Sequence, residues 1–254
     1  MIISLLFGYL FSDPKFLLIV AAVIPALVLL IYVYRRDRIE KEPGSLLLSL
    51  VLWGIVSTFL AVISESIGAV LLAYFLPGGE NNRAYAFWMF FVTVGLSEEG
   101  FKYLILKWRT WRSPYFNCRF DGVVYAVFVS LGFALWENIG YVAYYGLTTA
   151  LVRAVTAVPG HACFGVFMGT WYGLAKRRQG AGDLAGAAKF RRTALIVPML
   201  LHGFYDFCAT YQDSVMGLVF LVFVIAMFVT ANRLVMRMSA NDAYIDRNGF
   251  GFRN

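Results

Sequence analysis

The chain has 254 residues, of which 60% are apolar and 15% are charged, and its mean hydropathy is +0.69. These values exclude an ordinary soluble globular domain and indicate that lipid surrounds most of the protein. The net charge of +7 does not indicate nucleic-acid binding, because the basic residues lie in short clusters between apolar runs.

Apolar runs of about 18 residues or more predict seven transmembrane helices. In chain order they cover residues 15–34, 45–76, 84–106, 120–145, 148–175, 193–210 and 214–234. The second run is longer than the roughly 20 residues needed to cross a bilayer, so we expect it to tilt, break or protrude. The predicted fold is therefore all-α, a polytopic bundle of about seven transmembrane helices.

The basic residues predict the orientation of this bundle. All but four of the 22 Lys and Arg residues fall in four clusters on one side, within residues 35–41, 107–119, 176–192 and 233–253. By the positive-inside rule this side is cytoplasmic, so we expect the N-terminus outside and the C-terminus in the cytoplasm. The segment between the fifth and sixth spans is expected to be a basic cytoplasmic loop.

We expect one membrane-embedded domain over residues 1–238 and a polar, mobile cytoplasmic tail over residues 239–254. The apolar N-terminus has no basic n-region and no small-residue cleavage site, so a removable signal peptide is not expected. Cys118, Cys163 and Cys208 lack metal-ligand spacing, and we interpret them as free thiols.

Polar side chains occur inside four of the predicted spans, where an ionisable group facing lipid costs at least a few kcal/mol. Pairs four residues apart lie on one helix face, and the fifth-span histidine follows a Pro-Gly pair at which a helix can kink. Because all lie at similar depth, we expect them to face one another or a cavity. They are Glu98, Glu99 and Lys102, then Glu137, Asn138 and Tyr141, then His161, and finally His202 and Asp206.

Each residue also has a simpler explanation. Glu98 and Lys102 can neutralise each other, either histidine can hydrogen-bond a neighbouring helix, and Glu137 can be a protonated carboxyl. Structural bonding alone does not need two histidines and four acids in one layer, so we favour a functional site. We place Glu65 outside this set as a structural or rim residue, and Arg153 as one that snorkels or caps the site.

The layer contains the groups that amide hydrolysis requires, namely a base, an oxyanion stabiliser and an acid. Glu98 or Glu99 can activate water, and Lys102 helps to keep one carboxylate ionised. The two histidines can donate to the oxyanion or protonate the leaving amine, and Asp206 can orient His202.

A zinc site is the other use of two histidines and a carboxylate, with the second glutamate as base. The sequence has no HExxH helix, so such a site would be assembled across helices. Its ligands would come from Glu98 or Glu99, His161 and His202. The residues leave a metal mechanism and a metal-free mechanism both open.

Four motifs in this chain together resemble the PrsW family of bacterial intramembrane proteases. They are EEGFK at 98–102, DGVVYAVFVSLGFALWENIGY at 121–141, PGHACFG at 159–165 and HGFYD at 202–206. The segment RDRIEKEP after the first span also resembles a PrsW segment, and the likeness covers nearly all the spans in order. The family belongs to a wider group with the type II CAAX prenyl proteases and the Abi proteins.

The resemblance implies a role for each matching residue. Glu98 and Glu99 match the double-glutamate motif, whose acids are regarded as catalytic, and Lys102 matches its basic companion. Phe133 and Glu137 match an FxxxE element, in which the CAAX proteases have histidine instead of glutamate. The remaining motif residues are His161, and His202 with Asp206. The wider group has been described both as metalloproteases and as glutamate proteases, so zinc stays open.

We therefore expect an intramembrane endopeptidase of the bacterial plasma membrane that acts on a membrane-anchored protein. The PrsW prototype cleaves a membrane-anchored anti-sigma factor at its first site. A proton- or ion-coupled transporter also uses buried acids and histidines, but we find no repeated half in the chain. A catalytically silent scaffold that binds transmembrane helices is the third alternative. No nucleic-acid partner is expected, and the sequence does not predict the oligomeric state.

Overall fold

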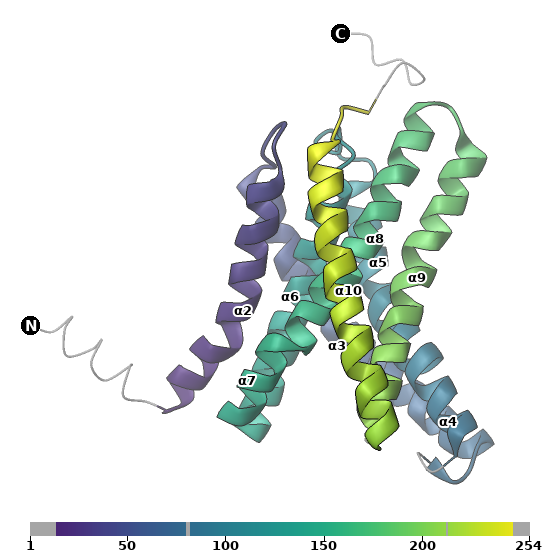
Figure 1. The fold of residues 1–254 in the computed structure, drawn as a ribbon. Coiled ribbons are helices and arrows are strands. Elements are labelled where there is room, and N and C mark those ends of the chain that lie inside the picture. The colour runs from purple at the N-terminus through teal and green to yellow at the C-terminus, as the bar shows by residue number, and fades with distance from the viewer. Residues whose placement is uncertain (1–13, 80–81, 212, 246–254) are drawn as a thin grey trace, which may run out of the picture.

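The computed structural model describes residues 14–79, 82–211 and 213–245, which form helices joined by short loops (Figure 1). The expected absence of a signal peptide and the expected mobile tail concern residues that lie largely outside this range. In chain order the elements are α2 (Pro14–Arg36), α3 (Gly44–Phe75), α4 (Arg83–Phe87), the π-helix η2 (Trp88–Val94), α5 (Gly95–Thr110), α6 (Asp121–Tyr145), α7 (Leu147–Val155), α8 (Ala157–Gly180), α9 (Leu184–Thr210) and α10 (Ser214–Ala240).

Six helical segments in the described residues are long and apolar enough to cross a membrane, so the chain is a multi-pass, all-α membrane protein. They are Phe16–Arg36, Gly44–Phe75, Asp121–Tyr145, Leu147–Gly180, Leu184–Thr210 and Ser214–Ala240. The predicted span 84–106 is not among them. It forms α4, η2 and α5 and carries the charged motif residues.

The helices differ from the expectations at two places. The fifth predicted span breaks at Thr156 into α7 and α8, so its proline lies in the first turn of α8, where a missing N–H costs least. The basic segment predicted to be a loop is mostly helical, because α8 continues to Gly180 and α9 begins at Leu184. Asp183 caps α9 by accepting a hydrogen bond from the N–H of Gly186 (2.8 Å).

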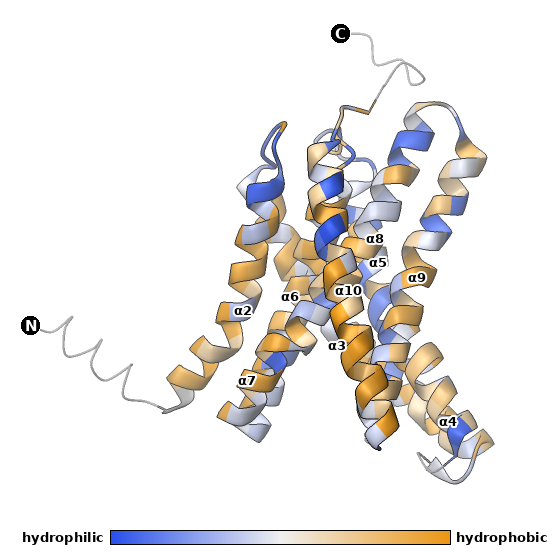
Figure 2. Ribbon diagram, in the orientation of Figure 1, coloured by the Kyte–Doolittle hydropathy of each residue, from blue (hydrophilic) through white to orange (hydrophobic). Residues whose placement is uncertain are grey.

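All the loops that carry basic clusters meet at one end of the bundle. The α2–α3, α5–α6 and α8–α9 connections and the end of α10 lie together at the top of Figure 1. Figure 2 shows the corresponding hydrophilic positions at this end and apolar helix surfaces below it. We call it the basic end, and the positive-inside rule predicts that it faces the cytoplasm.

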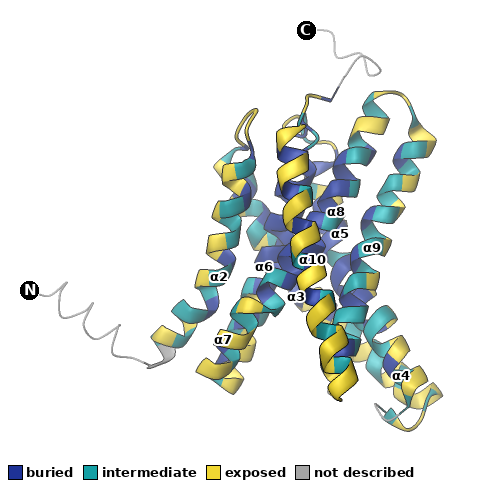
Figure 3. Cartoon of the chain, viewed as in Figure 1, coloured by how far each residue is buried: buried dark blue, intermediate teal, exposed yellow. Residues whose placement is uncertain are grey.

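Helices α6 and α8 form the buried centre of the bundle, while α2 and α10 expose apolar faces on the outside (Figure 3). Small residues allow this close packing. A Cβ atom on Gly169 of α8 would lie 2.4 Å from the carbonyl oxygen of Gly122 of α6, which is closer than real contacts allow. The glycines therefore let the two helices approach, and this contact fixes where their polar side chains meet.

Candidate active site

A cavity of about 400 Å³ lies among α3, α5, α6, α8 and α9, together with η2 and α7. It is lined by most of the polar residues that the sequence placed in one layer. Its polar and ionisable lining includes Glu65, Glu98, Glu137, Tyr141, Arg153, His161, His202, Tyr205 and Asp206. The structure therefore brings the four polar segments together around one space.

Lys102 is the centre of the polar network beside this cavity. Its ammonium group donates to Glu99 Oε1 (2.7 Å), to Glu98 Oε2 (3.2 Å) and to His161 Nδ1 (3.1 Å). It also lies 3.9 Å from the centre of the Phe133 ring, so this ring faces a cation. Lys102 is fully buried, and its contacts with two acids and a ring offset the cost of burying its charge.

His161 joins this network to Glu137 on α6. Because its Nδ1 accepts from Lys102, its Nε2–H is free to donate to Glu137 Oε2, which lies 2.8 Å away. Arg153 forms a second ion pair with the same carboxylate oxygen at 3.0 Å. The imidazole is thereby held in one tautomer and one orientation.

His202 contacts carboxylates through both of its ring nitrogens. Its Nδ1 lies 3.0 Å from Glu99 Oε1, and its Nε2 lies 3.4 Å from Asp206 Oδ2. Phe164 stacks on the ring with a centroid distance of 4.6 Å and restricts its rotation. A histidine between two carboxylates is well placed to carry and donate a proton.

Two contacts hold the start of α5, which carries the glutamates, against the neighbouring helices. The π-helix η2 immediately precedes α5, and a Cβ atom on Gly203 of α9 would lie 2.8 Å from Phe91 of η2. This close contact brings α9 and its histidine against the start of α5. On the other side, a hydrogen bond of 2.8 Å between the hydroxyls of Ser64 and Ser97 joins α3 to α5.

Two residues that the sequence analysis set aside lie at the cavity. Glu65, which the sequence analysis placed outside the set, lines the cavity, because the Ser64–Ser97 contact places it beside the first turn of α5. Arg153 pairs with Glu137 inside the site instead of only capping it. Hydropathy does not predict that Glu65 or Arg153 lies at the cavity, because this depends on how the helices cross.

Asn138 and Tyr141, which the sequence placed in the polar layer, both contact the guanidinium group of Arg153. Asn138 is fully buried, accepts from Arg153 Nε (2.9 Å) and donates to the carbonyl oxygen of Ala22 on α2 (2.8 Å). Tyr141 presents its ring 4.0 Å from the Arg153 guanidinium. Neither residue joins the Lys102 network, so both support the site through Arg153.

Comparison with known proteins identifies the family to which this arrangement belongs. The model of the "PrsW family intramembrane metalloprotease" matches residues 42–231, which include all four polar segments. The chain belongs to the PrsW family. It is 35% identical over 195 residues to Protease PrsW of Bacillus subtilis, covering 77% of this chain and 84% of the relative.

Other members show the same extent of similarity. Protease PrsW of Geobacillus kaustophilus is 33% identical over 87% of this chain and 91% of its own length. The Oceanobacillus iheyensis protein is 32% identical over 87% of this chain and 95% of its own length. No solved structure matches the chain significantly. Membership in the PrsW family makes the chain an intramembrane peptidase, so the transporter interpretation is not retained.

The PrsW family is described as metalloproteases, and this chain has a donor set that fits a metal ion. One ligand atom each from Glu98, Glu99, His161 and His202 lies within 4.8 Å of the others. In addition, Glu99 Oε2 is buried without a hydrogen-bond partner, as expected of an oxygen that awaits a cation or a water. Lys102 contacts three of the four residues, so its ammonium and a metal ion would share these donors.

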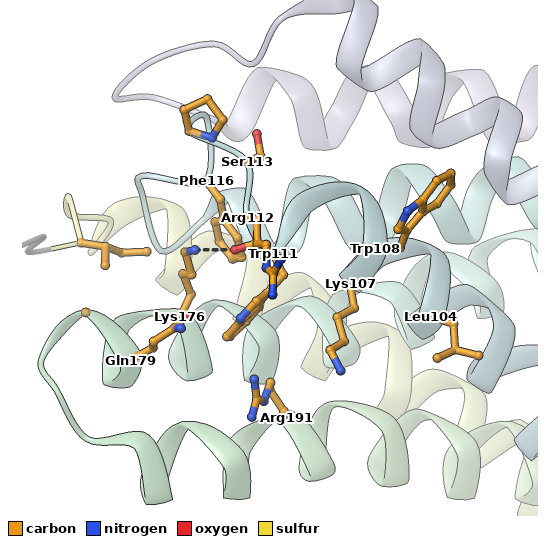
Figure 4. A pocket seen from close by; sticks show the side chains of 13 residues that line it. Leu104, Lys107, Trp108, Trp111, Arg112, Ser113, Phe116, Lys176, Gln179 and Arg191 are labelled. Carbon is orange, nitrogen blue, oxygen red and sulfur yellow. Dashed lines mark hydrogen bonds between the residues drawn. The ribbon is translucent and has the colours of Figure 1, made fainter. Parts of the chain in front are cut away.

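A larger cavity, of about 1110 Å³, lies at the basic end and not at this site (Figure 4). Its lining is basic and aromatic, and Lys176 there donates to the carbonyl oxygen of Trp111 (2.6 Å). Its lining contains neither a histidine nor a carboxylate, so it lacks the acid–base pairs that the four motifs bring together. The smaller cavity is therefore the candidate active site.

Proposed function

We propose that this PrsW-family peptidase cleaves a membrane-anchored protein within or near the bilayer, with Glu98 as the base that activates water. The observation that carries this assignment is the different placement of the two adjacent glutamates. Glu98 lines the cavity, whereas Glu99 is fully buried behind it. Only Glu98 can therefore reach a water molecule beside a substrate peptide in the cavity.

Glu99 serves as a positioning residue in this proposal. Its Oε1 holds both Lys102 and His202, at 2.7 Å and 3.0 Å. Lys102, held in this way, places a positive charge 3.2 Å from Glu98 and favours the ionised form of the base. In the same way, Glu137 positions His161 and Asp206 positions His202.

The histidines complete the reaction. His202, with Asp206 behind it, is placed to protonate the leaving amine, and His161 lines the same cavity and can stabilise the oxyanion. The two rings lie 5.3 Å apart between their centres, so both can contact one scissile peptide. Base, acid and oxyanion donor thus surround one space.

We further propose that a zinc ion can occupy this donor set, held by Glu99, His161 and His202. The two histidines are then ligands instead of proton and oxyanion donors, and Glu98 remains the base and passes the proton from water to the leaving amine. Zinc in such a set polarises the scissile carbonyl and lowers the pKa of a bound water. His161 supports the assignment, because its nitrogen opposite Glu137 faces the other donors.

The proposed substrate is a membrane-anchored protein whose transmembrane segment reaches this depth. An anti-sigma factor cleaved at its first site is the substrate that the family resemblance implies, and it is the first candidate to test. The plasma membrane is the proposed location, in agreement with the bacterial source of the relatives.

Comparative proteomics of membrane-bound fragments tests the proposal. Cells with the wild-type protein should contain cleaved membrane-anchored fragments that are absent from cells with Glu98→Gln, expressed at the same level. Gly140→Ala is a suitable control, because a Cβ at Gly140 contacts nothing within 4 Å. Identical fragment patterns for the wild type and Glu98→Gln would refute the role of Glu98.

A further inference from the structure

A second group of buried carboxylates lies at the basic end of the bundle, away from the active site. Asp37 and Glu42 lie between α2 and α3, Asp121 begins α6, and Asp242 follows α10. The first three are only 2%, 4% and 0% exposed. Asp121 and Glu137 are separated by 16 residues of one helix, which is about 24 Å. The proposed mechanism uses none of the four acids at the basic end.

Three of these acids are fixed through one carboxylate oxygen. Tyr125 donates its hydroxyl to Glu42 Oε2 (2.5 Å), and the N–H of Cys118 donates to Asp121 Oδ2 (2.7 Å). Asp242 Oδ1 accepts from the backbone of the same α5–α6 connection (2.8 Å). The protein therefore holds each carboxylate in a defined orientation.

Among the described residues, no N–H or hydroxyl donates to the other oxygens of the group, and Glu42 lies within hydrogen-bond reach of Asp121, so a shared proton is the alternative to a cation. Glu42 Oε1, Asp121 Oδ1 and Asp242 Oδ2 are buried without a hydrogen bond, and so are both carboxylate oxygens of Asp37. The side-chain oxygen of Asn117 beside them is also unsatisfied. Leaving buried acceptors unpaired costs about 1–3 kcal/mol each, so this many in one place require a common partner.

Asp121 is the centre of the group, because Glu42 lies within hydrogen-bond reach of it and Cys118 and Asp242 lie close to it. Ligand atoms of Cys118, Asp121 and Asp242 lie within 4.8 Å of one another. Burial, with smaller contributions from Asp242 and Glu40 and against the opposing charge of Lys41, raises the pKa of Asp37 to about 6. Burial, opposed by the hydrogen bond from Tyr125 and assisted by the charge of Asp37, raises the pKa of Glu42 to about 7. The carboxylates are thus close enough to repel one another.

The basic side chains nearby do not neutralise this charge directly. The Lys41 ammonium donates to the backbone carbonyl oxygens of Tyr34 and Asp37, and the Arg119 guanidinium donates to that of Asn241. Among the described residues, neither forms an ion pair within 4 Å of the four acids. The Cys118 thiol is a soft donor, whereas hard cations prefer the oxygens of the acids around it.

We propose that Asp37, Glu42, Asp121 and Asp242, with the side-chain oxygen of Asn117, bind a hard divalent cation of the Mg²⁺ or Ca²⁺ type. Such cations take carboxylate and amide oxygens as ligands. The bound cation ties the α2–α3 connection, the start of α6 and the segment after α10 into one unit. This site is independent of the active-site donor set and remains if that set binds no metal.

The described residues after α10 pair with the α5–α6 connection, beside the proposed cation site. The N–H of Arg119 donates to the carbonyl oxygen of Ala243 (3.2 Å), and the N–H of Ile245 donates to that of Asn117 (2.7 Å). Asp242 therefore stays at the cluster through a short backbone pairing and not through α10 alone. Loss of the cation should loosen this segment first.

Mn²⁺ binding to the full-length protein in detergent micelles tests the proposal, since Mn²⁺ is a hard cation with a measurable spin-resonance signal. The protein carries His161→Ala and His202→Ala, which disable the active-site donors, and is first stripped with a chelator. We expect one bound Mn²⁺ per chain and a higher melting temperature with Mg²⁺ or Ca²⁺. Adding Glu42→Gln or Asp37→Asn should weaken Mn²⁺ binding roughly tenfold or more.

Asp183→Asn is the control. Asp183 also lies at the basic end, but it caps α9 and pairs with Arg178 (3.2 Å) away from the four acids, so Mn²⁺ binding should not change. Absence of bound Mn²⁺ in the stripped double-histidine protein, or equal affinity in Glu42→Gln, would overturn the proposal. If Asp37→Asn does not fold, Glu42→Gln decides.

Discussion

Glu98 and Glu99 are adjacent in the chain, yet only Glu98 lines the active-site cavity, while Glu99 is fully buried against Lys102 and His202. One residue of helix rotation, about 100°, separates a group that can meet water from one that orients its neighbours. Neutralising Glu98 and neutralising Glu99 should therefore have different effects on activity and on stability.

Glu98→Gln is expected to lower peptidase activity roughly 100-fold or more while the protein stays folded, because it removes only the base. Glu99→Gln should also lower the melting temperature, since it weakens the bonds to Lys102 and His202. Cleavage of a membrane-anchored reporter in proteoliposomes and thermal unfolding measure the two effects. Equal loss of stability in both variants would contradict the division of roles.

Lys102→Met is expected to destabilise the protein by about 3–5 kcal/mol, because it leaves a buried carboxylate without its cation. Lys107→Met is the control, since Lys107 is an exposed residue of the same helix, and its loss should have little effect. Chemical unfolding in mixed micelles measures the difference. Similar unfolding midpoints for both variants would show that Lys102 does not hold the site together.

Zinc binding should depend on the fully buried Glu99 and not on Glu98, the proposed base. We expect Glu99→Gln and His161→Ala to lose zinc, and Glu98→Gln to keep it although it is inactive. Elemental analysis of purified protein gives the metal content without reference to activity. If the active wild type contains no zinc and tolerates chelators, the glutamate acts without a metal.

Arg153→Met should reduce activity roughly tenfold, because Glu137 then loses one of its two cationic partners and holds His161 less firmly. Arg153→Lys should restore part of the loss, since lysine keeps the charge but not the hydrogen bond to Asn138. The effect should appear in kcat more than in KM. A change in KM alone would mean that Arg153 contacts the substrate instead.

Gly169→Ala is expected to destabilise the protein by about 1–3 kcal/mol, because its new methyl group would collide with the backbone of Gly122 and separate α6 from α8. Gly140→Ala, on an open surface of α6, should be neutral or slightly stabilising. Thermal unfolding of both variants tests the contact. Activity of Gly169→Ala should fall with stability, since the same contact sets the distance between Glu137 and His161.

The sequence by itself determined the membrane class, most of the helices and the polar residues of the active site. Long apolar runs leave few alternatives to helices, because backbone groups in lipid must bond within their own segment. The cost of burying charges then predicts that Lys102 and the two histidines meet other polar groups. Local periodicity and burial cost were sufficient for these conclusions.

The tertiary structure alone decided which glutamate reaches the cavity, and it added Glu65 and Arg153 to the site. It also placed Glu42 beside Tyr125, although 83 residues separate them in the chain. These relationships depend on how the helices cross, which is set by contacts such as Gly169 with Gly122 and Ser64 with Ser97. Hydropathy records depth along one helix, but not the rotation or tilt that brings two helices together.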